Sequence, residues 1–217
     1  AEDHKTNRDL QSDRELTLKL VEKRPELYEF ASDENKADKE IAETCFRSDG
    51  RLIRFAPESI RSDPEVALIA ATDYPLCVAF LTGEAAESKK VAMVVAESGG
   101  SAIEMLPKKF FSDKDIARAA VSKNARNIRF FTDDVRADES VCLAALAQDR
   151  TVCAYFSNDA FSSDKVFEKS VRADRGVISP NTLSNDMPPG LFEKIAEKNM
   201  TEDCDTDVLT QEALCKF

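Results

Sequence analysis

The sequence predicts an all-α fold, an α-solenoid of tandem two-helix repeats of about 25 residues each. Two observations predict it: acidic residues recur at a fixed spacing, and apolar residues follow each of them with the period of a helix face. The 25-residue grid consists of Asp13, Asp38, Asp63, Asp113 and Asp138, with Ser88 in its vacant slot and Asp164 one residue late.

The first half of each copy carries a helical pattern. Small or apolar residues stand three, four, seven and eight places after the grid position, as in Val66, Ala67, Ala70 and Ala71. These spacings place the side chains on one face of an α-helix, and the frequent alanine lets neighbouring helices approach closely. We therefore expect a longer first helix in every copy.

The second half begins after a position often held by a helix breaker, such as Pro25 or Gly50. The apolar pattern then returns, which predicts a shorter second helix. An aromatic residue or methionine recurs within it, and we expect this row to plug the space between layers: Phe30, Phe55, Phe80, Met105, Phe130 and Tyr155. A capped single turn is expected to follow in some copies, as at residues 57–60.

Residues that cap helices mark the predicted helix starts. A short oxygen-bearing side chain before the first turn accepts hydrogen bonds from N–H groups that have no partner inside the helix. A ligand or catalytic role for the recurrent aspartates is the less favoured alternative. The predicted caps are Ser12, Asp13, Asp38, Asp63, Asp113, Asp138 and Asp164.

The pattern divides the chain into three parts. Residues 12–173 hold six to seven repeats, and residues 1–11 form an N-terminal arm. Beyond residue 173, glycine and proline residues such as Gly176 and Pro180 interrupt the 25-residue pattern. Because the last repeat of a solenoid must shield an apolar layer from water, residues 174–217 are expected to be a C-terminal capping region and tail.

The recurring strings DKEIA at residues 38–42 and GRLIRFAPESIRSD at residues 50–63 resemble the domain-of-unknown-function 4116 repeat. The likeness extends over roughly residues 12–163 and is strongest from 38 to 66 and from 113 to 138. The resemblance implies a tandem helical repeat. It implies no general activity and carries no catalytic residues over to this chain.

The charge excludes some classes of partner. With 41 acidic and 30 basic side chains, the net charge of −11 disfavours nucleic acid and anionic lipid. No run approaches the roughly 18 apolar residues of a spanning helix, so we expect no direct membrane insertion. The expectation is a soluble protein, cytoplasmic or organellar, in the latter case after removal of a targeting segment ahead of Ala1.

The residues that carry common enzyme chemistry are scarce. His4 is the single histidine, and the sequence contains no phosphate-binding glycine loop and no nucleophile elbow. We therefore predict no enzyme activity, no catalytic residue, no cofactor and no metal site. A weak calcium site at the acidic cluster of Asp203, Asp205 and Asp207 is a minor alternative to a solvated tail.

Six cysteines fall into two groups. Cys45, Cys77, Cys142 and Cys153 occupy apolar slots of the repeat, which predicts buried and unreactive thiols. A second group, Cys204 and Cys215, lies in the tail. A disulfide between them is the alternative to two free thiols, and it would imply an oxidising compartment.

The third and fourth copies are more apolar than their buried stripe requires. Leu68, Ile69, Met93 and Val94 lie beside the stripe, with Tyr74 nearby. One interpretation is that central helices, flanked on both sides, bury more surface. The other is an exposed apolar ridge that receives a protein or peptide.

Three functions follow from these features. The favoured one is a non-enzymatic protein-interaction scaffold that binds a protein or peptide of unknown identity on one face of the solenoid. The second is a structural accessory subunit of a larger complex, such as an organellar membrane complex. The third is an enzyme or small-ligand protein with an unrecognised site of acids and cysteines.

Overall fold

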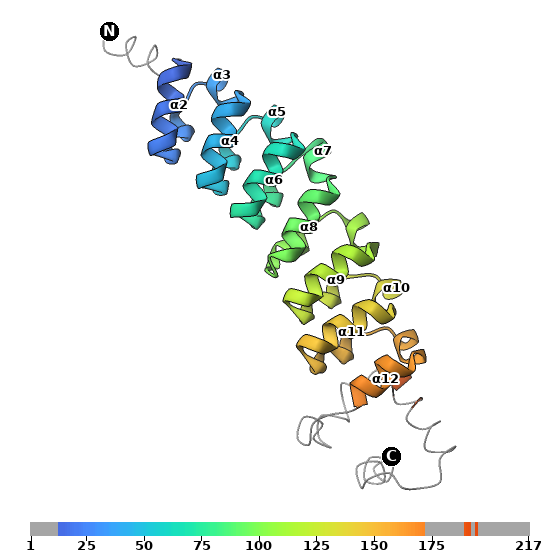
Figure 1. Ribbon diagram of the computed structural model, residues 1–217. Helices are drawn as coiled ribbons and strands as arrows, with labels where there is room; N and C mark the ends of the chain where they lie inside the picture. The colour runs from blue at the N-terminus through green and yellow to red at the C-terminus, as the bar shows by residue number, and fades with distance from the viewer. Residues whose placement is uncertain (1–12, 172–188, 192–193, 195–217) are drawn as a thin grey trace, which may run out of the picture. The chain divides into compact units, whose positions relative to one another are not determined.

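The computed structural model of the chain describes residues 13–171, 189–191 and 194 (Figure 1). Within these residues all regular secondary structure is helical, and no strand occurs. The chain divides into two compact units, the first ending at Phe110 and the second beginning at Phe111, and each is described by itself. The N-terminal arm expected at residues 1–11 lies outside the described residues.

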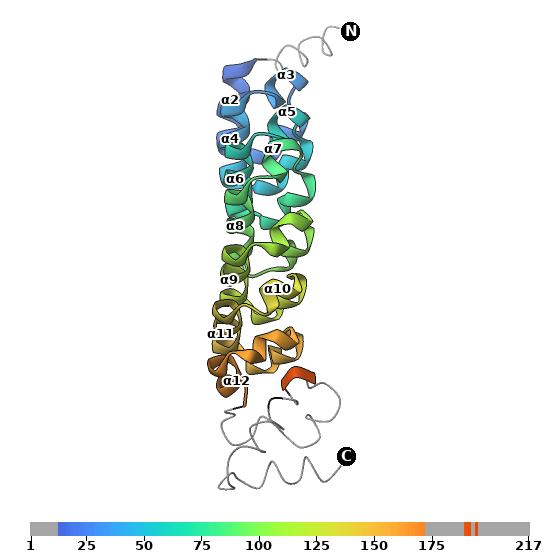
Figure 2. The ribbon, with the colours of Figure 1, turned by 90° about the vertical axis from the view of Figure 1, so that its right-hand side faces the viewer.

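One long α-helix begins each copy, and successive starts are 25 residues apart. The predicted all-α fold and its 25-residue repeat are therefore confirmed. In the first unit these helices stand side by side in one column, as Figure 2 shows. The long helices are α2 (Arg14–Lys23), α4 (Lys39–Ser48), α6 (Pro64–Asp73), α8 (Lys89–Glu97), α9 (Lys114–Lys123), α11 (Glu139–Gln148) and α12 (Asp164–Val171).

The second helix of each copy is a 3-10 helix. These are η1 (Pro25–Phe30), η2 (Gly50–Phe55), η3 (Pro75–Phe80), η4 (Ser101–Met105), η6 (Ala125–Phe130) and η7 (Arg150–Tyr155). A third, single-turn element leads into the next copy. It is α-helical in α3 (Asp33–Lys36), α5 (Glu58–Arg61), α7 (Gly83–Ala86) and α10 (Asp133–Arg136), and 3-10 in η5 (Lys108–Ser112) and η8 (Asn158–Ser162).

The core consists of the helix face that the spacing predicted. In α6 the residues Val66, Ala67, Ala70 and Ala71 are fully buried, and the equivalent residues of α4 are buried as well. Their small side chains allow α6 to pack against both α4 and α8. Within each unit, successive copies thus cover one another's apolar face.

The recurrent aromatic residues do not plug the space between layers. Phe30 is 62% exposed and Met105 is 49% exposed, whereas Ile53 and Ile103, two places earlier in the repeat, are fully buried. The reason is the 3-10 geometry, which has three residues per turn. It places Ile103 and Leu106 on the inner face and leaves Met105 beside them at the surface.

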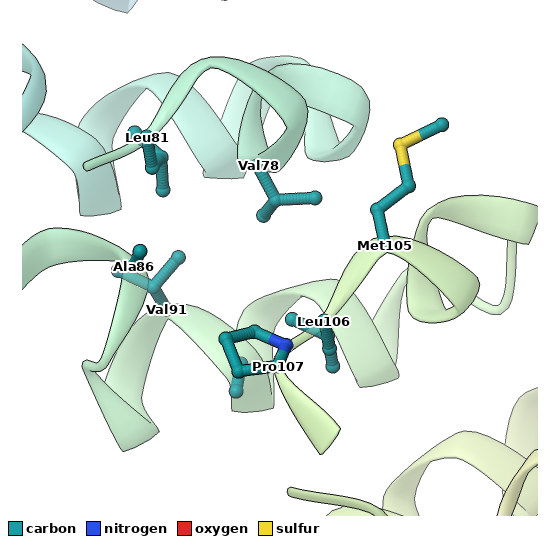
Figure 3. Close-up of a pocket in the computed structure, with 8 residues that line it drawn as sticks. Val78, Leu81, Ala86, Val91, Met105, Leu106 and Pro107 are labelled. Carbon is teal, nitrogen blue, oxygen red and sulfur yellow. The ribbon is translucent and has the colours of Figure 1, made fainter. Parts of the chain in front are cut away.

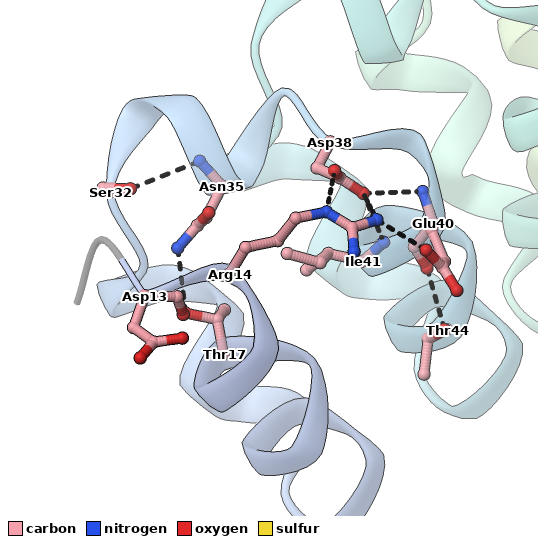
Figure 4. Close-up of polar contacts among 9 residues, drawn as sticks. All are labelled: Asp13, Arg14, Thr17, Ser32, Asn35, Asp38, Glu40, Ile41 and Thr44. Carbon is pink, nitrogen blue, oxygen red and sulfur yellow. Dashed lines mark hydrogen bonds and ion pairs between the residues drawn. The ribbon is translucent and has the colours of Figure 1, made fainter. Parts of the chain in front are cut away.

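The recurrent aspartates connect neighbouring copies. Asp38 caps α4 by accepting hydrogen bonds from the N–H groups of Glu40 at 3.0 Å and Ile41 at 3.1 Å (Figure 4). The same carboxylate accepts from Arg14 Nε of the preceding copy at 2.7 Å. The Arg14 guanidinium, together with these N–H groups, lowers the pKa of Asp38.

This arrangement repeats in both units. Asp63 caps α6 and pairs with Lys39 at 2.9 Å, and Asp138 caps α11 and pairs with Lys114 at 2.6 Å. Asp113 caps α9, and Asp13 accepts from the N–H group of Leu16 at the start of α2. Ser12 lies outside the described residues. Each of these aspartates therefore stands at the start of a helix, and Asp63 and Asp138 also pair with a lysine of the previous copy.

The expectation that Asp164 is a cap is wrong. It lies in the first turn of α12, and Ser163 stands at the grid position instead, where its Oγ accepts from the N–H group of Val166 at 3.4 Å. The 25-residue grid therefore continues without a break. The charges at this place are inverted, since Glu139 occupies the usual position of the cation and pairs with Lys165 at 3.1 Å.

Two described residues of the expected capping region, Gly190 and Lys194, contact the last copies of the second unit. The N–H group of Gly190 donates to Asn158 Oδ1 at 3.1 Å, and Lys194 pairs with Asp164 at 3.1 Å. Leu191 is buried. These contacts are those expected of a segment that covers the end of a repeat array.

The Asp138 cap yields a stability prediction. Partial burial tends to raise its pKa, but hydrogen bonds from Lys114, Ser140 and the N–H group of Val141 outweigh burial and lower the pKa to about 2. We expect Asp138→Ala to lower the free energy of unfolding by about 1 kcal/mol at pH 7. Since the folded pKa lies below the ordinary 3.8, this loss should be complete above about pH 4 and vanish as the pH falls towards 2.

Urea unfolding of both proteins across this pH range measures the difference. The control is Asp134→Ala, which removes an exposed acid of α10 that caps no helix. A loss of equal size in the control, or one that does not change with pH, would contradict the role given to Asp138.

Candidate protein-binding surface

The residues of the expected apolar ridge lie on the first unit, along α6 and α8. Leu68, Ile69, Met93 and Val94 are half-buried, and so is Tyr74 at the end of α6. All except Met93 pack against the core from its edge. We call these five residues the apolar ridge. The structure thus leaves part of each side chain accessible, and brings α6 and α8 into direct contact.

The same helix positions in α4 show that burial does not require apolar residues there. Glu43 and Thr44 of α4 correspond to Leu68 and Ile69 of α6, and all four side chains are half-buried. These positions are therefore polar in one copy and apolar in the next.

Tyr74 departs from the pattern of its own position. Asp49, Asn124 and Asp149 hold this position in other copies, and each side chain accepts a hydrogen bond from the N–H group two residues later, at 2.9–3.1 Å. Tyr74 caps η3 with no such bond. This copy therefore carries a half-buried aromatic residue at a position where three other copies have a capping side chain.

The 3-10 helices expose a second apolar row, which sequence reasoning placed in the interior. In the first unit it comprises Phe30 and Met105, which are exposed, and Phe55 and Phe80, which are half-buried against the core. The Arg54 guanidinium lies 4.5 Å from the centre of the Phe55 ring, so this ring is partly covered by a cation. The 25-residue recurrence in the sequence indicated that these residues form a row. The prediction that the row is buried assumed an α-helical second helix, whereas the structure has a 3-10 helix.

An apolar pocket of about 150 Å³ opens between the third and fourth copies (Figure 3). Val78 and Leu81 form one wall, and Ala86 with Val91 forms another. The remaining lining comes from Ala92, Met105, Leu106 and Pro107. This pocket could not be predicted from the sequence, because its walls come from segments up to 29 residues apart, from Val78 to Pro107.

Two other junctions carry an arginine at the position of Ala86. Arg61, one repeat before Ala86, donates from Nη1 to the Phe80 carbonyl of the next copy at 3.2 Å, and its Nε is buried. Arg136 makes the same contact with the Tyr155 carbonyl at 3.0 Å, and its Nε is also buried. Ala86 has no side chain that could reach the corresponding carbonyl.

A backbone hydrogen bond is also missing at this junction. At other junctions, the second residue after the 3-10 helix donates its N–H group to a carbonyl of the preceding copy. The N–H group of Thr82, for example, donates to the Arg61 carbonyl at 3.2 Å. Ser157 does the same to Arg136 at 3.3 Å. Pro107 occupies this position in the fourth copy and has no N–H group to give to the Ala86 carbonyl.

The first junction carries a proline too, at Pro57, but compensates for it. The hydroxyl of the buried Tyr28 donates to the Lys36 carbonyl at 2.7 Å, in place of the missing N–H group. At the third junction the residue equivalent to Tyr28 is Val78, which has no hydroxyl. The pocket therefore lacks both polar donors that are present at the Arg61 and Arg136 junctions.

The four cysteines predicted to be buried thiols are free. Cys45, Cys77 and Cys142 are buried, and Cys153 is half-buried. Burial raises the pKa of Cys45 and of Cys77 to about 12, so neither forms the thiolate that nucleophilic chemistry requires. Cys204 and Cys215, and with them the predicted disulfide, lie outside the described residues.

The described residues hold no group of three or more His, Cys, Asp and Glu side chains that could bind a metal ion. His4 and the acidic cluster of Asp203, Asp205 and Asp207 lie outside them. In the same part of the chain, no helix has the length and the apolar character that a membrane crossing needs.

Comparison with known proteins agrees with the repeat. Residues 38–84 match the family described as Domain of unknown function (DUF4116). The resemblance inferred from the recurring strings is thus confirmed for this segment, which contains α4, η2, α5, α6 and η3. No curated protein and no solved structure matches the chain.

The compensation at the first junction is testable. Tyr28→Phe removes the donor to the Lys36 carbonyl, so we expect the free energy of unfolding to fall by about 1 kcal/mol. Adding Pro57→Thr should recover most of this loss, because threonine supplies the N–H group that Thr82 supplies at the second junction. Urea unfolding of the two variants measures both effects.

Tyr155→Phe is the matched control, since this tyrosine is 39% exposed and its hydroxyl is within reach of water. It should leave the stability nearly unchanged. A Tyr28→Phe variant as stable as the parent, or one that Pro57→Thr does not rescue, would show that the proline is not compensated in this way.

Proposed function

We propose that the chain is a non-enzymatic protein-interaction scaffold that binds a protein or peptide partner on the apolar ridge of the first unit. The observation that carries the proposal is the contrast between equivalent positions. Leu68 and Ile69 stand where α4 has Glu43 and Thr44, and all four side chains are half-buried. Apolar side chains that the fold does not demand, and that water reaches, favour a contact with another molecule.

The neighbouring residues extend this surface. Met93 and Val94 occupy the same two positions in α8, which packs directly against α6. Tyr74 adds an aromatic ring at a position where three other copies have a capping side chain. Tyrosine and methionine are residue types that protein interfaces favour over the rest of the surface. The ridge thus offers side chains from two adjacent helices to one partner.

The chemistry of the rest of the described chain supports a binding role rather than a catalytic one. The pKa values of Asp38, Asp49 and Asp138 are lowered by hydrogen bonds and ion pairs that cap helices or join copies. The buried thiols have raised pKa values. These pKa shifts have structural causes. The groups that show them are not acids and nucleophiles gathered around one pocket.

Affinity capture from extracts of the source cells tests the proposal. The full chain should retain a partner in near-stoichiometric amount, and the double variant L68K/M93K should lose it, since two charges would have to be desolvated in the contact. Thr44→Lys is the matched control, because it adds a lysine at the Ile69-equivalent position of α4. It should retain the partner.

Titration calorimetry with the purified partner should then show binding weakened at least about tenfold by L68K/M93K. Equal capture by the parent chain and L68K/M93K would overturn the assignment of the ridge. Size-exclusion chromatography of native extracts tests the alternative of a permanent accessory subunit. That alternative would be favoured if the chain eluted only as part of one large complex and never alone.

A further inference from the structure

We propose that the apolar pocket between the third and fourth copies binds an arginine side chain supplied by a partner protein. The inference rests on the proposed scaffold function and deepens it, because it assigns a chemical identity to one residue of the partner. It concerns a site separate from the ridge, lined by Val78, Ala86, Met105 and their neighbours (Figure 3).

The first argument is the internal occupant of equivalent sites. Arg61 and Arg136 show what the repeat places at this position in two other copies: an arginine whose Nη1 donates to a backbone carbonyl of the next copy, and whose Nε is buried without a hydrogen-bond partner. Ala86 leaves the space open while the walls remain. A ligand with the shape of an arginine side chain would restore the arrangement that the fold forms elsewhere.

The second argument is the set of acceptors at the pocket. The Met105 carbonyl corresponds to the Phe80 and Tyr155 carbonyls that receive Nη1 at the other junctions. The Ala86 carbonyl corresponds to the Arg61 carbonyl, which accepts a hydrogen bond from the N–H group of Thr82. Pro107 is the equivalent of Thr82 and has no N–H group. Both missing groups are donors. A guanidinium, with five N–H donors and no acceptor, is the side chain that suits two carbonyls in an apolar wall.

The size of the pocket fits the same ligand. A cavity of about 150 Å³ holds a group of roughly the size of benzene. A guanidinium with its adjoining methylenes is of that order, and the methylenes would lie against Val78, Leu81 and Val91. The net charge of −11 favours the encounter with a basic segment, and Lys109 near the pocket is already paired with Glu87.

Methyl-detected NMR of the full chain tests the proposal with three probes. N-acetyl-L-arginine amide should shift the methyl signals of Val78, Leu81, Val91 and Met105 in a saturable manner. N-acetyl-L-citrulline amide, which has nearly the same shape but no charge, should bind about tenfold more weakly, because charged donors form the stronger hydrogen bonds. N-acetyl-L-norleucine amide, which has no donor at the end of its side chain, should bind more weakly still.

The decisive variant is Ala86→Arg, which supplies the missing side chain from within the chain. It should abolish the shifts caused by the arginine probe, and the variant should unfold at a higher urea concentration than the parent. Ala79→Arg is the matched control, because it adds the same charge at an exposed position of η3 and leaves the pocket open. It should bind the probe like the parent.

Three results would overturn the proposal: norleucine amide binding as tightly as arginine amide, Ala86→Arg retaining the shifts, or arginine shifts centred on residues away from the pocket. The ridge variant L68K/M93K separates this inference from the function on which it rests. Unchanged binding of the arginine probe by that variant, whatever the outcome of partner capture, shows that the pocket acts independently of the ridge.

Discussion

The structure depends on burial of an apolar face that no single copy can cover. The first helix of each copy is too short to be stable alone in water, and its inner face consists of small apolar residues such as Ala67 and Ala71. Stacking on the neighbouring copy removes that face from water. The recurrent aspartates fix the register of the stack, because Asp38 both caps its own helix and pairs with Arg14 of the copy before.

A repeat whose stability comes from neighbouring copies can vary at its surface without losing its fold. Position by position, Asp49 becomes Tyr74, and Glu43 becomes Leu68. These changes remove a cap or expose apolar surface, but they leave the buried face and the junctions intact. Departures from the repeat are therefore where a function specific to this chain is to be sought, and both proposals rest on such departures.

The third junction shows how two departures combine. Pro107 alone would cost one backbone hydrogen bond, as Pro57 does at the first junction, where Tyr28 compensates. Ala86 alone would leave only an empty space. Together they create an apolar pocket with two backbone acceptors whose usual donors are absent, and this gives the pocket a chemical preference as well as a volume.

The sequence by itself determined the helical class, the 25-residue period, the buried face of the long helices and most of their caps, because these depend on residues within one turn or one copy. Only the tertiary structure decided which face of the 3-10 helices is buried, that Ser163 rather than Asp164 holds the grid, and that a pocket exists at Ala86. Each of these depends on the backbone geometry of the second helix or on contacts between copies. The period of the long helices could not supply that information, because 3-10 helices follow a different period and the partners in the contacts lie about 20 residues apart in the chain.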